Sequence, residues 1–266
     1  MTGLMKGKRG LIMGVANDHS IAWGIAQQLA AQGAELAFTY QGEAFGKRLE
    51  PLAASVGSSF LMPCDVEDIV SVDAVFASLQ EKWGKIDFLV HSIGFSDKNE
   101  LKGKFADTSR ANFSRTMVIS AFSFVEVTKR AAALMPDGGS IITLTYGGSQ
   151  RVMPNYNVMG VAKAALEASV RYLAADYGPQ GIRVNALSPG LMRTLAGAGV
   201  GDGRKMYAFA EAHAPLRRAV ALEEVGGAGL YLLSAMSGGV TGEIHYVDAG
   251  YNIISMPRTE DLMKPS

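Results

Sequence analysis

The chain alternates short runs of apolar, β-branched or aromatic residues with longer segments in which apolar residues recur at helical spacing. The short runs predict strands at 9–15, 35–40, 59–62, 86–92, 140–146, 182–188 and 243–247. The longer segments predict helices at 20–32, 44–54, 68–83, 110–134, 157–177 and 222–236. This regular alternation predicts a parallel sheet covered by helices on both faces.

No Pro/Ser-rich linker, low-complexity tract or repeat divides the chain. We therefore predict one α/β domain over 1–266, a doubly wound, Rossmann-like fold with a seven-stranded parallel sheet. The stretches 94–108 and 189–203 interrupt the alternation, and the second carries five glycines before the amphipathic run 204–214. Loops after strand carboxyl ends surround the ligand crevice of such folds, so 190–214 is predicted to be a substrate lid.

Composition excludes several classes of function. The 25 Lys and Arg balance the 25 Asp and Glu, and no basic block occurs, which argues against nucleic-acid and membrane-surface roles. No run reaches the roughly 18 apolar residues of a membrane helix, and the apolar run near the start is too short for a signal peptide. The single cysteine, Cys64, and four widely spaced histidines offer no metal site, and a reducing, cytoplasmic location fits best.

The end of the first predicted strand is typical of a dinucleotide-binding turn. Gly14 permits a tight turn there, and Ser20 and Ile21 open the following helix, whose amino terminus offers unpaired N–H groups to a pyrophosphate. This segment departs from the usual G-x-G-x-x-G pattern, so by itself it is also compatible with a structural turn.

Three further strand ends are expected at the same crevice. Asp65 and Val66 follow the third strand, where a carboxylate can accept a hydrogen bond from an adenine amino group, and Ile93 follows the fourth. Gln41 follows the second strand, where an acidic residue would hold the adenosine 2′-hydroxyl and an arginine a 2′-phosphate. Gln41 is neutral, and the nearest arginine, Arg48, is a turn or more into the next helix, so NADH is favoured over NADPH.

Tyr156 and Lys163 are the strongest candidates for the chemistry. They are seven residues apart, which places them on one face of a helix that begins at the same sheet edge. An ammonium near a phenol favours the phenolate and so lowers the pKa of the phenol, which can act as a proton donor to a carbonyl oxygen. Tyr146 ends the fifth predicted strand and faces the same crevice. Taken alone, the Tyr-x6-Lys spacing also occurs by chance on solvated helix faces.

These motifs resemble the short-chain dehydrogenase/reductase superfamily. The Tyr-x9-Tyr-x6-Lys spacing, the segments 91–95 and 155–160, and 193–196 resemble, more narrowly, the NADH-dependent enoyl-acyl-carrier-protein reductases of bacterial fatty-acid synthesis. Ketone- and alcohol-handling relatives usually carry a serine about 13 residues before the catalytic tyrosine. Here that position is Thr143, and Tyr146 replaces its function.

The resemblance implies reduction of a trans-2-enoyl thioester carried by acyl-carrier protein. Hydride from NADH would reach the β-carbon, Tyr156 would stabilise the enolate oxygen, and Lys163 would hold the nicotinamide ribose. Tyr146 would shape or assist the site, and Ser96, Tyr156 and Met159 would contact the substrate. By the same resemblance the cofactor contacts are Gly14, Ser20, Ile21, Gln41, Asp65, Val66, Ile93, Lys163, Leu191, Met192, Arg193, Thr194 and Leu195.

Two other functions remain open at this point. A short-chain ketone or alcohol dehydrogenase would use the same fold, and a non-catalytic NAD-binding regulator would keep the fold without the chemistry. The predicted helices 110–134 and 157–177 are rich in Ala, Val and Phe around much of their circumference. Such helices can pair with copies of themselves, and the resemblance implies a homotetramer.

Overall fold

Seven strands form one parallel sheet in the computed structural model, which describes residues 3–192 and 203–258. The strands are β1 Arg9–Met13, β2 Glu35–Tyr40, β3 Phe60–Pro63, β4 Phe88–His91, β5 Gly139–Leu144, β6 Ile182–Pro189 and β7 Ile244–Val247. They lie in the order β3-β2-β1-β4-β5-β6-β7, and every neighbouring pair is parallel. The predicted fold class, a seven-stranded doubly wound sheet, is confirmed.

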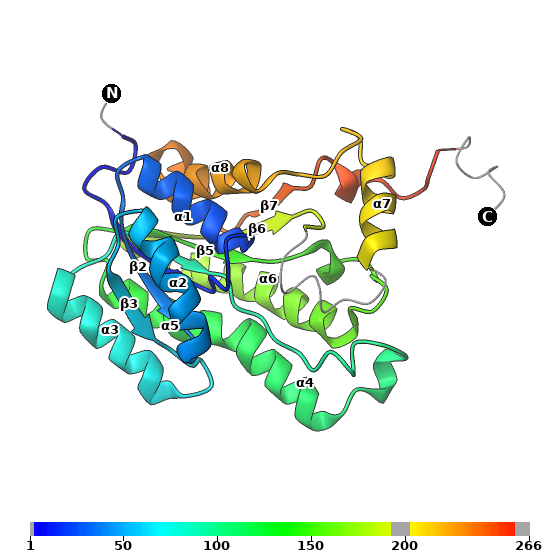
Figure 1. Cartoon of the computed structure of the whole chain (residues 1–266), viewed down its shortest axis with the longest axis horizontal. Helices are drawn as coiled ribbons and strands as arrows, with labels where there is room; N and C mark the ends of the chain where they lie inside the picture. The colour runs from blue at the N-terminus through cyan, green and yellow to red at the C-terminus, as the bar shows by residue number, and fades with distance from the viewer. Residues whose placement is uncertain (1–2, 193–202, 259–266) are drawn as a thin grey trace.

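Helices cover both faces of this sheet (Figure 1). The helices are α1 Ile21–Ala31, α2 Glu43–Ser55, α3 Ile69–Trp83, α4 Arg110–Met117, α5 Ser123–Ala133, α6 Asn157–Tyr177, α7 Gly203–His213 and α8 Leu222–Leu233. Buried residues of α1, α2 and α8 form one hydrophobic cluster, and those of α3, α5 and α6 form another. Successive side chains of β1 point to opposite faces of the sheet. Leu11 and Met13 belong to the cluster with α3, α5 and α6, whereas Ile12 belongs to the cluster with α1, α2 and α8.

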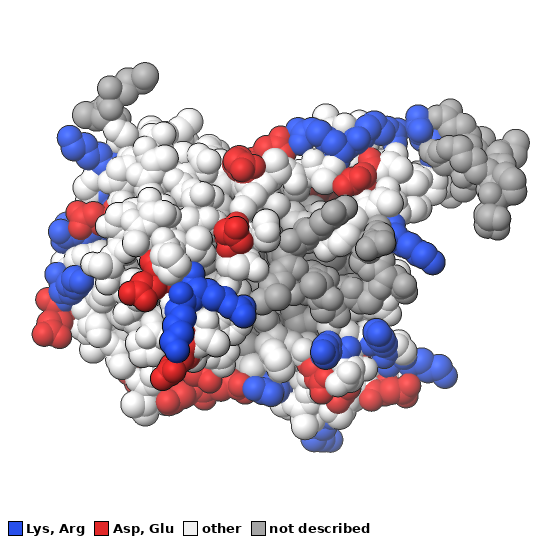
Figure 2. All heavy atoms as spheres, in the orientation of Figure 1, with Lys and Arg blue, Asp and Glu red and all other residues white. Residues whose placement is uncertain are grey.

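The strand order reverses between β1 and β4, which lie side by side although β2 and β3 intervene in the chain. In an open parallel sheet this reversal leaves a crevice beyond the carboxyl ends of the two strands. The loops that follow β1, β4 and β5 therefore converge at one edge of the sheet. Acidic and basic side chains are interspersed over the face shown in Figure 2.

The helix predicted over about 110–134 is present as a continuous helical run over 110–133, but its pitch changes in the middle. α4 ends at Met117 and α5 begins at Ser123, and the residues between them, Val118–Phe122, form a single π-helical turn, called here the π-turn. Ser123 Oγ donates a hydrogen bond to the Ile119 carbonyl at 2.6 Å, and Ser120 Oγ turns away from the helix to bind another segment. The apolar pattern does not reveal this change of pitch, because the extra residue leaves both flanking helices amphipathic.

α1 and α8 lie against each other at glycines. A Cβ added at Gly226 would lie 2.5 Å from the Gly24 carbonyl oxygen, whereas one added at Gly227 would meet no atom within 4 Å. Gly226 thus faces the packed interface with α1, whereas Gly227 faces open space. The close approach of α1 to α8 depends on Gly226, and α1 is the helix that follows the Gly14 turn.

We expect Gly226→Ala to destabilise the fold by about 1–3 kcal/mol, because the added methyl group forces α1 and α8 apart. The matched variant Gly227→Ala should be neutral or stabilise by up to about 1 kcal/mol, because alanine favours the helix and clashes with nothing. Urea unfolding followed by circular dichroism measures both. Equal effects of the two substitutions would contradict the packing described here.

Candidate active site

The backbones that follow β1 and β4 touch at Gly14. This residue has φ +97°, and a Cβ on it would lie 1.9 Å from the Ser92 carbonyl oxygen. Only glycine therefore fits at this position, for reasons of both conformation and space. The contact brings the turn before α1 next to the loop that carries Ile93 and Gly94.

Ser20 fixes the turn between β1 and α1. Its Oγ accepts hydrogen bonds from the backbone N–H groups of Ala16 at 3.0 Å and Asn17 at 3.1 Å. It makes no side-chain bond to α1, so it orders the turn rather than capping the helix. The first N–H groups of α1, which begins at Ile21, consequently have no side-chain cap, and a helix amino terminus of this kind suits a pyrophosphate.

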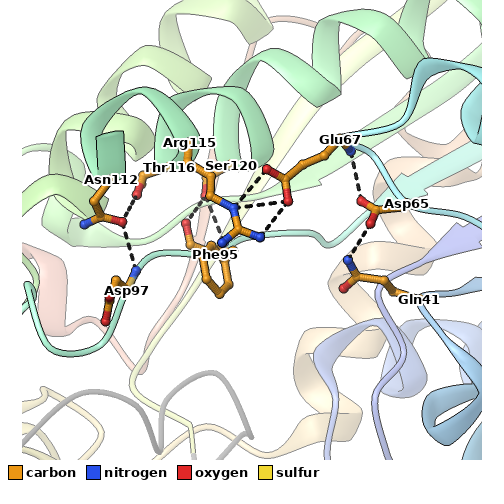
Figure 3. Close-up of polar contacts among 9 residues, drawn as sticks. All are labelled: Gln41, Asp65, Glu67, Phe95, Asp97, Asn112, Arg115, Thr116 and Ser120. Atoms are coloured by element: carbon orange, nitrogen blue, oxygen red, sulfur yellow. Dashed lines mark hydrogen bonds and ion pairs between the residues drawn. The ribbon is translucent and has the colours of Figure 1, made fainter. Parts of the chain in front are cut away.

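Gln41 and Asp65 meet at the ends of β2 and β3 (Figure 3). Gln41 Nε2 donates to Asp65 Oδ2 at 3.0 Å, and the other carboxylate oxygen accepts the Glu67 N–H at 3.0 Å. Val66, which lies between Asp65 and Glu67 in the chain, is buried. A neutral amide and one carboxylate suit the hydroxyl and amino groups of an unphosphorylated adenosine, and the guanidinium of Arg48 lies 5.8 Å from the ring centre of Phe45. These residues fit NADH.

An ion pair that the sequence analysis missed joins the two walls of this region. Arg115 on α4 donates from Nε and Nη2 to the carboxylate of Glu67, at 2.9 and 2.7 Å, and its guanidinium lies 4.5 Å from the ring centre of Phe95 (Figure 3). The pair is exposed, so it contributes little stability. Its value is geometric, because it ties the β3–α3 loop and α4 to the loop after β4. Spacing could not reveal it, since 48 residues separate the partners.

The loop after β4 is bound to the π-turn. Ser120 Oγ accepts from the Phe95 N–H at 2.9 Å and donates to the Phe95 carbonyl at 3.0 Å. The same hydroxyl lies 3.7 Å from Met159 Sδ. A methyl group on Gly94 would lie 3.6 Å from Met159 Cε and 3.8 Å from Lys163 Nζ. The π-turn thus holds this loop beside α6, at the predicted substrate and cofactor residues.

Ser96, predicted to contact the substrate, is bonded to α4. Its Oγ accepts from Thr116 Oγ1 at 2.9 Å and from Asn112 Nδ2 at 3.2 Å. Asn112 Oδ1 also accepts the Asp97 N–H at 3.0 Å (Figure 3). The contact of Ser96 with substrate stays a prediction.

Tyr156 and Lys163 lie where the helical spacing predicts, at the start and in the second turn of α6. Lys163 Nζ donates to the Leu144 carbonyl, the last residue of β5, at 2.7 Å. The rings of Tyr146 and Tyr156 meet edge to face, with centroids 5.2 Å apart and an interplanar angle of 76°. The structure therefore brings Tyr146, Tyr156 and the strand end beside Lys163 together.

The backbone on either side of Tyr156 is strained. Asn155 and Asn157 have φ of 57° and 35°, in the left-handed region that few residues other than glycine adopt. Asparagine tolerates this region better than most side chains. Such strain is characteristic of functional sites, and here it sets the direction from which Tyr156 enters α6.

Burial dominates the electrostatics of these groups. It raises the pKa of Tyr156 above its ordinary value, and the neighbouring Tyr146 and Glu167 raise this pKa further. The prediction that Lys163 lowers the pKa of Tyr156 is therefore wrong, because loss of hydration on burial is the largest effect and raises this pKa. Burial also lowers the pKa of Lys163 to about 8, although Glu167 opposes this effect. At neutral pH the site holds a neutral phenol beside a charged ammonium.

The hydroxyl of Tyr146 is buried and makes no hydrogen bond with any described residue. Burial raises its pKa, so it remains a neutral donor. Tyr146 lines a cavity of about 160 Å³ together with residues of 147–153, 188–191 and 248–254. A buried hydroxyl without a partner is costly in a fold, and it is available to a ligand.

Thr143 and His91 occupy the interior of the sheet beneath the site. His91 Nδ1 lies 2.9 Å from Thr143 Oγ1, and Nε2 lies 3.0 Å from Ser123 Oγ. Burial, with Lys163 adding to it, lowers the pKa of His91 to about 3, so the imidazole is neutral. Both residues are fully buried. Thr143 consequently presents no hydroxyl to the crevice at the position where ketone-handling relatives carry a serine.

The segment after β6 is described only in part. Leu191 lines the cavity beside Tyr146, and the Met192 carbonyl accepts a hydrogen bond from Tyr207 Oη on α7 at 2.9 Å. The predicted cofactor residues Arg193, Thr194 and Leu195 lie outside the described residues. α7 forms over most of the amphipathic run predicted at 204–214.

Comparisons with known proteins identify the family of this chain. The sequence profile described as "Enoyl-(Acyl carrier protein) reductase" matches residues 14–252. This chain belongs to the enoyl-acyl-carrier-protein reductase family. A Rhizobium meliloti (strain 1021) member of the family, enoyl-acyl-carrier-protein reductase (NADH) 2, is 73% identical over 262 residues, 98% of each chain.

Solved structures of the family share the fold closely. FabI from Candidatus Liberibacter asiaticus superposes with a TM-score of 0.95 at 61% identity, over 97% of this chain and 100% of that one. The reductase of Anaplasma phagocytophilum, solved in complex with NAD, gives a TM-score of 0.94 at 54% identity, over 97% and 99%. The described helices include none that is long and apolar enough to cross a membrane.

We expect Ser120→Ala to release the loop after β4 from the π-turn. The Phe95 N–H loses its acceptor, which costs roughly 1 kcal/mol, so exchange of this amide with deuterated solvent should accelerate about five-fold. Ser114→Ala, on the exposed side of α4, is the matched control and should leave the exchange rate unchanged. Hydrogen-exchange mass spectrometry of 92–97 measures both, and unchanged protection in Ser120→Ala would contradict this role.

Proposed function

We propose that this chain reduces the trans-2 double bond of an enoyl thioester carried by acyl-carrier protein, with NADH, as the last reductive step of bacterial fatty-acid elongation. The observation that carries the proposal is the pair of Tyr156 and the buried Lys163 at the edge of the sheet, with the Tyr146 ring against the Tyr156 ring. Membership of the enoyl-acyl-carrier-protein reductase family gives the substrate class.

NADH supplies the hydride that the β-carbon of the substrate receives. The residues that would hold it are spread along one crevice. Gly14, Ser20 and Ile21 receive the pyrophosphate, because the turn is tight and the helix amino terminus is uncapped. Gln41, Asp65 and Val66 would hold the adenosine end, and Ile93, Leu191 and Met192 would contact the rest of the cofactor. Arg193, Thr194 and Leu195, which lie outside the described residues, are proposed as further contacts.

Tyr156 donates to the oxygen on which the thioester enolate develops. Its high pKa keeps the proton on the phenol until negative charge appears on the oxygen. Transfer of this proton to the oxygen gives the enol, a solvent-exchangeable proton then adds to the α-carbon as the oxygen returns its proton, and the saturated thioester results. One N–H of the Lys163 ammonium donates a hydrogen bond to the Leu144 carbonyl, and the other two would donate to the nicotinamide ribose. A neutral donor beside a fixed cation therefore stabilises the enolate.

Tyr146 borders the reacting centre on the side of Tyr156. Its ring holds the Tyr156 ring edge to face, and its unpartnered hydroxyl is a further donor for the thioester. Met159 and Ser96 are proposed to contact the substrate, and 190–214, part of which lies outside the described residues, is proposed as the substrate lid of a single 1–266 domain. Thr143 counts against a ketone or alcohol dehydrogenase because its hydroxyl is bound to His91. The retained Tyr156 and Lys163 count against a regulator without catalysis.

Tyr156→Phe should lower kcat for a trans-2-enoyl thioester by about 100- to 10,000-fold, because the enolate loses its proton donor. NADH oxidation, followed by its absorbance, measures the rate, and NADPH is compared in the same assay. Tyr146→Phe is the matched variant and should reduce the rate less.

NADH affinity of the Tyr156→Phe protein, measured by fluorescence, should match that of the unaltered chain, which separates loss of chemistry from loss of binding. Oxidation of NADH by a 3-ketoacyl thioester in place of the enoyl thioester would contradict the proposed reaction. So would a Tyr156→Phe variant with undiminished turnover.

We further propose that the chain acts in the cytoplasm as a homotetramer. The support is apolar surface on the neighbouring elements α4, the π-turn and α6, where Phe113, Phe122 and Val161 are exposed. Phe122 alone leaves 53% of its surface exposed. Surface of this kind is typical of contacts between copies.

Phe122→Lys should shift the protein from tetramers towards smaller species, because burying an ammonium in the contact is unfavourable. Sedimentation velocity measures the change. Val70→Lys is the control, since Val70 on α3 is 71% exposed and far from these helices in the chain. Sedimentation of the unaltered chain as a monomer would contradict the tetramer.

A further inference from the structure

Glu167 is a buried carboxylate to which neither the sequence motifs nor the proposed roles assign a task. It lies one turn beyond Lys163 on α6 and is 4% exposed. Residues four apart on a helix share one face. A buried carboxylate persists only where hydrogen bonds and an opposite charge offset its loss of hydration.

Two hydroxyl groups converge on one oxygen of this carboxylate. Thr145 Oγ1 donates to Glu167 Oε1 at 2.7 Å, and Ser149 Oγ donates to the same atom at 2.5 Å. The Ser149 N–H in turn donates to the Tyr146 carbonyl at 2.9 Å. Glu167 therefore closes the turn 145–149, in which Tyr146 is held between its two partners.

The turn 145–149 packs directly on Tyr156. A methyl group added at Gly148 would lie 2.5 Å from Tyr156 Cδ1 and 3.3 Å from Tyr146 Cδ1. On the α6 side, a methyl group at Gly160 would lie 2.7 Å from the Gly148 carbonyl. Any shift of the turn consequently displaces both tyrosine rings.

The negative charge of Glu167 also acts on Lys163, whose pKa it raises. The other titratable groups that act on these two residues are His91 on β4, Tyr156 just before α6 and Tyr246 on β7, and Tyr146 acts on Tyr156. His91 is neutral because burial lowers its pKa, and the tyrosines are neutral because burial raises theirs. Glu167 is thus the carboxylate that opposes the effect of burial on the pKa of Lys163.

We propose that Glu167 is a positioning residue of this reductase: its carboxylate anchors the turn 145–149 beneath Tyr146 and Tyr156 and balances the charge of the Lys163 ammonium. The inference rests on the proposed function. It adds a residue that acts through three others and touches neither cofactor nor substrate. The negative charge and the two hydrogen bonds are separate contributions, and different substitutions remove them.

Glu167→Gln removes the charge and keeps an oxygen that can accept from Thr145 and Ser149. In the unaltered chain, kcat/KM for the enoyl thioester should decline as the pH rises above about 8, where Lys163 loses its proton. Without the carboxylate, Lys163 loses its proton more readily, so the decline should move to lower pH by about one unit. The pH profile of NADH oxidation measures the shift, and circular dichroism with NADH binding verifies the fold.

Two matched variants separate charge from geometry. Glu167→Asp keeps the charge, and the decline should stay close to the pH of the unaltered chain. The double variant Thr145→Val and Ser149→Ala keeps Glu167 but removes both hydroxyl donors. It should lower kcat at every pH by about ten-fold, equivalent to the loss of about 1.4 kcal/mol of stabilisation, while leaving KM for NADH and the pH of the decline unchanged.

An unshifted decline in Glu167→Gln, or undiminished kcat in the double variant, would overturn the inference. If Glu167→Gln does not fold, the double variant still tests the anchoring of the turn 145–149, and undiminished kcat in it overturns the positioning role. The proposed function fails in a different way, because the unaltered chain would then not oxidise NADH with the enoyl thioester at any pH.

Discussion

The site depends on one buried cation. Lys163 is taken out of water on α6, and its ammonium is held by the Leu144 carbonyl at the end of β5, at 2.7 Å. Burying a charge is expensive unless hydrogen bonds and an opposite charge compensate for it. The fold meets this requirement by joining the strand end, the turn 145–149 and α6 into one unit, and Tyr146 and Tyr156 are carried on that unit.

The sheet explains why these groups meet the cofactor residues. β1 and β4 are neighbours, and their following loops approach so closely at Gly14 and Ser92 that no side chain fits at position 14. β5 lies next to β4, so the Tyr156 end of α6 faces the same crevice. The π-turn completes the arrangement, because Ser120 binds the backbone of Phe95 and holds the loop after β4 against α6.

Local patterns carry much of this structure in the sequence. The alternation of strands and helices predicts the parallel sheet, and the spacing of Tyr156 and Lys163 predicts their common face. Other features depend on contacts between distant residues, such as the 48 residues that separate Arg115 from Glu67. The spacing of residues also does not show how deeply they are buried. The pKa of Tyr156 therefore shifts in the direction opposite to the prediction, and the sequence does not indicate the role of Glu167. The sequence does not predict the π-turn, because the helices on either side of it keep their apolar faces.

The central claim is that this chain adds hydride from NADH to the β-carbon of an enoyl thioester, while the α-carbon receives its hydrogen from an exchangeable group. The most direct measurement is the position of deuterium in the saturated product, determined by NMR. Turnover in deuterated water with unlabelled NADH should place deuterium at the α-carbon, and deuterated NADH in ordinary water should label the β-carbon. Solvent deuterium at the β-carbon, or no transfer from the labelled cofactor to the acyl chain, would contradict the account.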